Sequence, residues 1–158
     1  MDSHWVHSNQ FEMSELLKGV TLKRNNGSDA KADDLKGKVV AFYFSAHWCP
    51  PCRLFTPELK EFYNEVNKDD ANDFEIVFFS FDRSDEDALA YLKESHGNWL
   101  YLLPQEKIVE DLGEKFGVEG IPALIVLKPD GSVITNDGRA EVQGAPAKEV
   151  LAKWKAEL

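Results

Sequence analysis

The sequence predicts an α/β domain in which helices flank a central mixed β-sheet. Two continuous apolar runs, residues 39–44 and 76–81, are typical of strands covered on both faces of a partly parallel sheet. Between them, apolar residues recur at spacings of three and four, which makes one face of a helix. Two later apolar segments, 123–127 and 132–135, flank Lys-Pro-Asp-Gly and predict an antiparallel hairpin.

The first elements along the chain are short. Residues 11–17 predict a turn or short helix, residues 20–24 a strand, and Asn26-Gly27 the turn of a hairpin. The helix after the first central strand has an apolar face that we expect to be buried, made of Leu54, Phe55, Leu59, Phe62, Tyr63 and Val66. An acidic surface loop at residues 69–73 then leads to the second central strand.

Further helices follow the second central strand. Ser84 and Asp87 form a capping signal for a helix through about Glu94, with inward residues expected at Ala88, Leu89, Tyr91 and Leu92. Residues 99–103 predict a short extended piece, and the spacing in residues 108–116 predicts a helix that stops near Gly117. Pro146 opens a terminal helix that packs back against the sheet through Ala147, Val150, Leu151 and Trp154.

Composition narrows the class of partner and the compartment. The 158 residues suit one domain, and 18 Lys and Arg against 28 Asp and Glu give a net charge of −10. This charge repels phosphate backbones and anionic lipid, so we expect neither nucleic acid nor a membrane surface as a partner. Residues 1–10 lack the pattern of a secretory signal, and no apolar run approaches the roughly 20 residues that span a bilayer. We expect a soluble, cytoplasmic monomer.

The two cysteines carry the chemistry. Trp48-Cys49-Pro50-Pro51-Cys52 joins the first central strand to its helix and contains the only cysteines of the chain. A helix N-terminus presents unpaired N–H groups and a positive dipole end, and thiols placed there have pKa values lowered from about 8.5 to roughly 3.5–7.5. Cys49 is therefore the expected nucleophile. Cys52, one turn inward, is the expected resolving thiol, and two thiols so placed can cycle between dithiol and disulfide.

The two prolines between the cysteines limit the hydrogen bonds available to the sulfur. Pro50 and Pro51 supply no N–H, so the amide of Cys52 is the main-chain donor best placed for the Cys49 sulfur. Their fixed φ angles also stiffen the turn. Arg53 follows on the first helical turn, where we expect it to face solvent.

These motifs resemble tryparedoxin and nucleoredoxin, which are dithiol-disulfide oxidoreductases of the thioredoxin superfamily. The likeness rests on Phe-Ser-Ala at 44–46, Trp-Cys-Pro-Pro-Cys-Arg at 48–53 and Gly-Ile-Pro at 120–122. It extends over about residues 16–156, including the segments 19–22, 35–40 and 128–131. The resemblance implies a single thioredoxin-like domain over 1–158, with residues 1–15 as an N-terminal extension and a segment inserted before the cis-proline loop.

The resemblance also implies a set of substrate-binding residues. The resemblance implies that Pro122 follows a cis peptide bond and faces the cysteine pair. It also implies that Ile121 offers backbone groups to an incoming substrate chain. Trp48, Pro50 and Pro51 complete the implied set. Without the resemblance, the Ile121-Pro122 dipeptide would be expected to be trans, since only about 5 to 6% of X-Pro bonds in folded proteins are cis.

Two features depart from ordinary thioredoxin. Tyr43 stands where thioredoxin keeps a buried Asp, so the proton of Cys52 must pass to water or to another carboxylate that folding brings close. The segment between Cys52 and Pro122 is also longer than a plain thioredoxin needs, which fits the tryparedoxin-like branch.

Simpler roles compete for several residues. His47 could tune Cys49 but is more simply exposed, whereas Trp48 is better interpreted as a surface platform beside the sulfur than as core. A zinc site is disfavoured because no second Cys-x-x-Cys supplies four ligands. No nucleotide- or flavin-binding glycine pattern is present, so we expect no cofactor. The remaining tryptophans, Trp5, Trp99 and Trp154, are expected to pack in the core.

The function that these observations predict is reduction of protein disulfides. The expected partners are disulfide-containing proteins, with peroxidases as one candidate class, and an external reductant that is either a low-molecular-weight dithiol or a reductase. One alternative is a redox-sensing binding module that regulates a partner protein. Another is an oxidase or isomerase of secreted proteins, against which the absence of a signal pattern argues.

Overall fold

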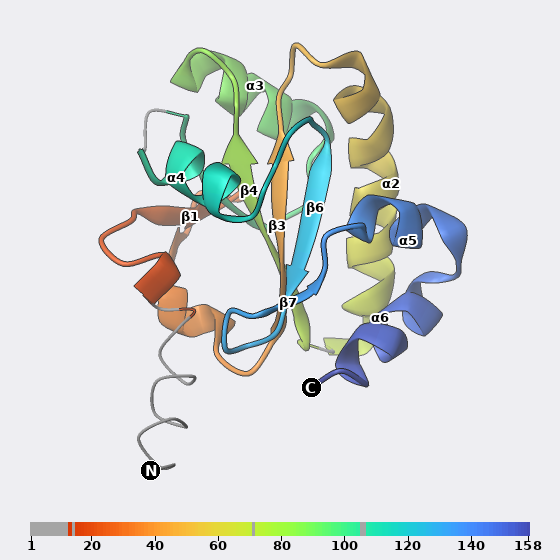
Figure 1. The fold of residues 1–158 in the computed structure, drawn as a ribbon. Helices are drawn as coiled ribbons and strands as arrows, with labels where there is room; N and C mark the ends of the chain where they lie inside the picture. Colours follow the sequence, from red (N-terminus) through yellow and green to blue (C-terminus); the bar gives the residue numbers. More distant parts are fainter. Residues whose placement is uncertain (1–12, 14, 71, 105–106) are drawn as a thin grey trace.

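The computed structural model describes residues 13, 15–70, 72–104 and 107–158 (Figure 1). Of the expected turn or helix at 11–17, residues 13 and 15–17 are described, and 13, 15 and 16 are helical, as expected, whereas Trp5 lies outside the described residues. The described elements run along the chain as β1 (Leu22–Arg24), β2 (Asp29–Ala30), the short 3₁₀ helix η1 (Ala32–Leu35), β3 (Val39–Ser45), α2 (Pro50–Val66), η2 (Lys68–Asp70), β4 (Phe74–Ser80), α3 (Asp85–Ser95), β5 (Leu100–Leu102), α4 (Lys107–Lys115), β6 (Ala123–Leu127), β7 (Val133–Thr135), α5 (Gly138–Gly144) and α6 (Ala147–Lys155).

A mixed sheet of seven strands forms the centre of the fold, in the order β2-β1-β5-β4-β3-β6-β7. β3, β4 and β5 are parallel neighbours, whereas β6 pairs antiparallel with β3, and β1 pairs antiparallel with β5. Every residue of β3 and of β4 is buried, as the apolar runs 39–44 and 76–81 predicted for most of both strands, although β4 also includes the charged Glu75. The predicted α/β class with a central mixed sheet and a thioredoxin-like arrangement is confirmed.

The two faces of the sheet have separate cores. Val39, Ala41 and Tyr43 of β3 pack in one core together with residues of α2, α3 and α6. The alternate residues, Val40, Phe42 and Phe44, pack in the other core with residues of α4 and of the N-terminal segment. Figure 1 shows α2, α5 and α6 on one side of the sheet and α4 on the other. Helices therefore cover both faces.

Local end signals in the sequence are confirmed at several elements. The Ser84 side chain accepts a hydrogen bond of 3.1 Å from the backbone N–H of Asp87 and caps α3. Lys128-Pro129-Asp130-Gly131 turns β6 into β7, and Pro146 precedes α6, whose Trp154 is fully buried. These turns and caps position the strand ends that carry the candidate site.

Two expectations about helices were wrong, and one helix was not expected. Leu54 is 75% exposed and Leu89 is 45% exposed, although both were expected to face inward. Each lies next to buried residues on its helix but is rotated by about 100° from its sequence neighbour, onto a side that no element covers. Helix α5 was not predicted, because it is short and bounded by glycines. Its Gly138 is required by packing, since a Cβ there would lie 2.8 Å from the Leu124 carbonyl oxygen.

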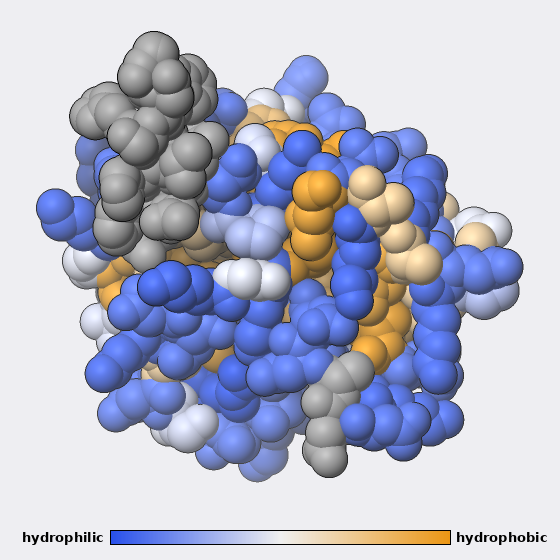
Figure 2. Space-filling view, turned by 90° about the horizontal axis from the view of Figure 1, so that it is seen from below, coloured by the Kyte–Doolittle hydropathy of each residue, from blue (hydrophilic) through white to orange (hydrophobic). Residues whose placement is uncertain are grey.

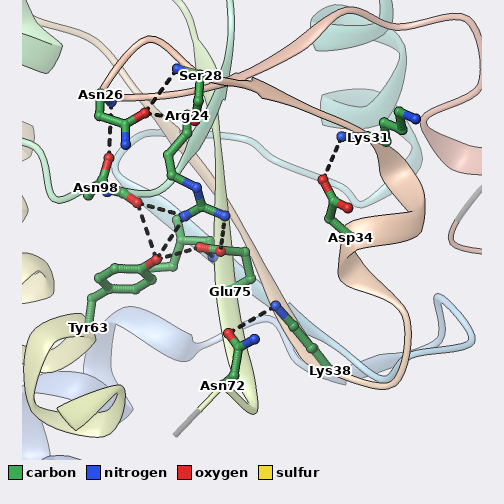
Figure 3. Close-up of polar contacts among 11 residues, drawn as sticks. Arg24, Asn26, Ser28, Lys31, Asp34, Lys38, Tyr63, Asn72, Glu75 and Asn98 are labelled. Atoms are coloured by element: carbon green, nitrogen blue, oxygen red, sulfur yellow. Dashed lines mark hydrogen bonds and ion pairs between the residues drawn. The ribbon is translucent and has the colours of Figure 1, made fainter. Parts of the chain in front are cut away.

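The end of the sheet opposite the cysteine pair holds a charged cluster. Arg24 of β1 forms an ion pair of 3.0 Å with Glu75 of β4, and the Tyr63 hydroxyl of α2 donates to the same carboxylate at 2.8 Å (Figure 3). Arg24 also donates to the Asn98 carbonyl oxygen at 2.8 Å. This cluster joins β1, β4 and the C-terminal half of α2.

The surface of this end is mostly polar. Figure 2 views it from below Figure 1, and hydrophilic side chains cover most of the face, with apolar residues visible only as separate patches between them. None of the helices in the described part of the chain is both long and apolar enough to cross a membrane.

Candidate active site

The cysteine pair lies where β3 passes into α2. Cys49 is the N-cap residue of α2, and its sulfur is joined to that of Cys52 in a disulfide. Cys49 is 4% exposed and Cys52 is fully buried. The pair is therefore asymmetric, with Cys49 nearer to the surface and Cys52 facing the interior.

The start of α2 follows from its sequence. Pro50 and Pro51 occupy the first two helical positions, where a missing N–H costs no intrahelical hydrogen bond. The backbone N–H of Cys52 points at the Cys49 sulfur over 3.3 Å, as the sequence predicted. The N-terminal end of the α2 dipole therefore faces this sulfur, an arrangement that stabilises a thiolate.

The cis-proline loop lies against the cysteine pair. The Ile121–Pro122 peptide bond is cis, as the resemblance implied, and the Ile121 carbonyl oxygen lies 3.8 Å from the Cys49 sulfur. The loop is held there because β6 begins directly after it and pairs with the C-terminal end of β3, Ala123 opposite Phe44. Backbone groups of Ile121 are thus placed beside the Cys49 sulfur.

Trp48 forms an exposed wall next to the pair. Its side chain is 54% exposed, and its indole N–H donates to the Phe81 carbonyl oxygen at 3.1 Å, which holds the ring in place. A cleft of about 620 Å³ opens beside it, bounded by Phe81, Asp82, Val109, Glu110 and Glu114 among others. Trp48 is therefore a surface residue and not a core residue.

Asp82 is a buried carboxylate near the motif that sequence reasoning missed. Its Oδ1 accepts from the backbone N–H of His47 at 2.8 Å, and its Oδ2 accepts from the Ser80 hydroxyl at 2.8 Å. The available signal was its place just after β4, because the carboxyl ends of neighbouring parallel strands meet at one edge of a sheet. Asp82 holds the loop that carries Trp48.

His47 and Arg53 are less free than expected. The His47 imidazole lies 2.8 Å from a Glu94 carboxylate oxygen and stacks on the Tyr91 ring with centroids 5.3 Å apart. Arg53 is exposed, as expected, but its guanidinium donates to the His47 carbonyl oxygen at 2.8 Å. Both side chains therefore brace the loop before Cys49.

Tyr43, which stands where thioredoxin keeps a buried Asp, lies in the interior. It is fully buried, and its hydroxyl lies 2.6 Å from the Thr56 hydroxyl. Burial raises the pKa of Tyr43 well above its ordinary value, so the group stays a neutral hydroxyl at physiological pH.

Comparison with known proteins agrees with this geometry. A family model described as Thioredoxin-like matches residues 37–133, which is more than half of the chain. The chain belongs to the thioredoxin-like family. The matched residues run from the start of β3 to the start of β7 and include both cysteines and the cis-proline loop. The site described above is thus the part of the chain that the family shares.

Individual members of the thioredoxin-like family are similar over most of the chain. Nucleoredoxin of Mus musculus is 45% identical over 129 residues, covering 81% of this chain and 29% of that protein. Tryparedoxin of Trypanosoma brucei brucei is 39% identical over 132 residues, which cover 82% of this chain and 89% of that protein. The crystal structure of thioredoxin from Wuchereria bancrofti matches with a TM-score of 0.75 and 51% identity. The match covers 90% of this chain and 98% of the thioredoxin chain. The chain thus spans less than a third of the nucleoredoxin.

Proposed function

We propose that the chain is a thiol-disulfide oxidoreductase that reduces protein disulfides. The observation that carries this proposal is the asymmetry of the pair: the Cys49 sulfur caps α2 and faces the Cys52 N–H, whereas Cys52 is buried one turn inward. A nucleophilic thiolate needs stabilisation and partial access, and a resolving thiol needs protection until a mixed disulfide forms. The two positions meet these two needs.

The proposed reaction has two exchange steps. In the dithiol form, the Cys49 thiolate attacks one sulfur of a substrate disulfide, that bond breaks, and the first substrate thiolate leaves. Cys52, after losing its proton, attacks the Cys49 sulfur of the mixed disulfide. The Cys49–Cys52 bond forms, the second substrate thiolate leaves, and two electrons have passed to the substrate. An external dithiol reverses the exchange and restores the reduced pair.

The surroundings of the pair support contact with a polypeptide substrate. Trp48 is exposed beside the sulfur, and the Ile121 carbonyl oxygen is within 3.8 Å of it. We assign Trp48, Pro50, Pro51, Ile121 and Pro122 to substrate binding. The substrates are disulfide-containing proteins, with peroxidases as a candidate class, and the reductant is a small dithiol or a reductase. The proposed location is the cytoplasm, where a reducing environment keeps the pair as a dithiol.

The reduction potential of the pair tests this proposal. Equilibration with defined glutathione or dithiothreitol buffers, followed by tryptophan fluorescence or thiol alkylation, should give a value between roughly −200 and −270 mV. Such a value lets the dithiol donate electrons to many protein disulfides. A value below about −300 mV would mark a stable structural disulfide and would overturn the proposal.

Trapping with a single-cysteine variant separates turnover from binding. Cys52→Ser should accumulate mixed disulfides with disulfide-containing proteins, since Cys49 can attack but nothing can resolve the product. Cys49→Ser is the matched control and should trap none. If Cys52→Ser also traps none while the unaltered protein binds a partner, the redox-sensing binding module is the better description.

A further inference from the structure

Four buried hydroxyl groups meet directly behind Cys52. Tyr43 and Ser45 come from β3, Thr56 from α2, and Tyr91 from α3. The described hydrogen bonds of the two sulfurs involve none of these four side chains. The Thr56 hydroxyl lies 2.6 Å from the Tyr43 hydroxyl and 2.6 Å from the Tyr91 hydroxyl. The Ser45 hydroxyl lies 2.7 Å from that of Tyr91. We call these four side chains the hydroxyl network.

The direction of every hydrogen bond in the hydroxyl network follows from one contact. The Thr56 hydroxyl lies 2.9 Å from the Cys52 carbonyl oxygen, which can only accept, so Thr56 uses its single hydrogen there. Tyr43 and Tyr91 must then both donate to Thr56. Because Tyr91 has no second hydrogen, Ser45 must donate to Tyr91. All four O–H bonds therefore lead toward the backbone of Cys52.

The turn of α2 that bears the cysteines depends on this support more than an ordinary helical turn would. Pro57 lies inside α2 and has no N–H, so the carbonyl of Arg53, four residues earlier, lacks its usual backbone donor. A proline also disfavours the helical conformation of the residue before it, which is Thr56. The helix is thus weakened at the point where the hydroxyl network joins it to β3 and α3.

The hydroxyl network stays neutral over the working pH range. Burial raises the pKa of Tyr43 and of Tyr91, so both remain donors. His96, whose ring lies 4.3 Å from that of Tyr91 and 6.1 Å from that of Tyr43, is itself buried and uncharged at neutral pH because burial lowers its pKa to about 3. The network therefore acts through geometry and dipoles, without a fixed charge.

We propose that Thr56 is a positioning residue for Cys52, which holds the resolving thiol in line with Cys49 through the hydroxyl network. The proposal rests on the proposed two-step exchange and concerns its second step. Cys49 lies before the first turn of α2 and against the cis-proline loop, and none of the described hydrogen bonds joins its side chain directly to the hydroxyl network, so its first attack does not need the Thr56 hydroxyl. Loss of that hydroxyl should slow the attack of Cys52 on the mixed disulfide and leave the attack of Cys49 on the substrate disulfide unchanged.

The two steps can be timed separately with 5,5′-dithiobis(2-nitrobenzoate), a symmetric aromatic disulfide. Attack by Cys49 releases one coloured thiolate and leaves a mixed disulfide, and attack by Cys52 then releases the second and forms the Cys49–Cys52 bond. Stopped-flow absorbance on the reduced protein resolves both releases, because the first depends on reagent concentration and the second does not. The intact chain is used throughout.

Thr56→Val is the central variant, because it keeps the shape and removes the hydroxyl. We expect the second release to slow about tenfold, which corresponds to about 1.4 kcal/mol in the activation free energy, with the first release within about twofold of the unaltered protein. Thr56→Ser should restore most of the second rate. Tyr63→Phe, which removes another buried hydroxyl from the same helix, is the matched control and should lower stability without slowing the second release.

Each result decides the proposal. An unchanged second release in Thr56→Val, or equal slowing in Tyr63→Phe, would overturn it. If Thr56→Val fails to fold, Tyr43→Phe and Tyr91→Phe replace it, and both must slow the second release while leaving the first. If the unaltered protein itself gives no second release, the proposed exchange fails, whatever the Thr56 variants do.

Discussion

Helix α2 is joined to the sheet by tyrosine hydroxyls near both of its ends, and the two connections differ in charge. At the cysteine end, Tyr43 of β3 donates to Thr56 of α2 within a network of neutral hydroxyls. At the far end, Tyr63 of α2 donates to Glu75, which is ion-paired with Arg24 (Figure 3). Both connections use buried groups from elements distant in sequence.

The difference reflects what each end has to do. A buried ion pair is tolerated where its charges are paired and hydrogen-bonded. The Glu75 carboxylate meets this condition, because it accepts hydrogen bonds from Arg24, from the Tyr63 hydroxyl and from the Ile76 N–H. Near the cysteines, the side chains that join α2 to β3 and α3 are neutral hydroxyls, whereas the buried carboxylate of Asp82 holds the loop before Cys49. The direct support of the helix at this end therefore adds no charge of its own next to a sulfur whose charge changes during exchange.

The largest effect is expected from breaking the charged end. Arg24→Met leaves the Glu75 side chain, which is 4% exposed, without its cation, and should lower the free energy of unfolding by about 3 kcal/mol. Urea unfolding followed by tryptophan fluorescence measures the loss. Lys23→Met removes an exposed ion pair with Asp29 on the same strand and should cost less than about 1 kcal/mol. Equal losses in the two variants would contradict the assigned role of the cluster.

A smaller loss is expected at the neutral end. Thr56→Val leaves the Tyr43 and Tyr91 hydroxyls without their acceptor and should cost about 2 kcal/mol, whereas Tyr43→Phe removes only one donor and should cost about 1 kcal/mol. The double variant Tyr43→Phe/Thr56→Val should be no less stable than Thr56→Val alone, because one orphaned donor is gone. Simple addition of the two losses would show that the hydroxyls act independently.

Acid should lower the free energy of unfolding, because protonation of His96 is disfavoured in the folded protein next to the neutral hydroxyl network. His96 accepts from the Trp99 indole N–H through Nδ1, and burial lowers the pKa of His96 to about 3. Between pH 6.5 and about 3 the unfolded chain binds the proton that the folded chain excludes. This contribution is therefore complete well above pH 6.5, and below pH 6.5 its loss approaches about 1.4 kcal/mol per pH unit.

Urea unfolding at pH 6.5 and 5.5, with His96→Gln as the comparison, checks this prediction. Glutamine does not titrate, so the variant should lose about 1 kcal/mol less than the unaltered protein over that unit of pH, because half of the unfolded chains already carry the proton at pH 6.5. Carboxylates titrate in both proteins and cancel in the difference. Parallel pH dependences would mean that His96 is not excluded from protonation in the folded state.

Much of the fold was predictable from sequence because its signals are local. The burial of β3 and of most of β4 is indicated by the apolar runs 39–44 and 76–81, and the start of α3 is indicated by the Ser84 cap. The outward positions of Leu54 and Leu89 were not predictable, since helical spacing gives the apolar side of a helix but not how far its neighbours extend over it. Helix α5 depends on the close approach of Gly138 to β6, which no local pattern records.

The candidate site divides in the same way. The cysteine spacing, the cap at Cys49 and the donor role of the Cys52 amide depend on residues within one turn of helix, so the sequence alone determined them. Only the tertiary structure decided that Thr56, Tyr43 and Tyr91 meet behind Cys52 and that Asp82 holds the preceding loop. The physical reason is range: caps and turns are set by neighbouring residues, whereas buried polar groups find partners only when distant elements pack together.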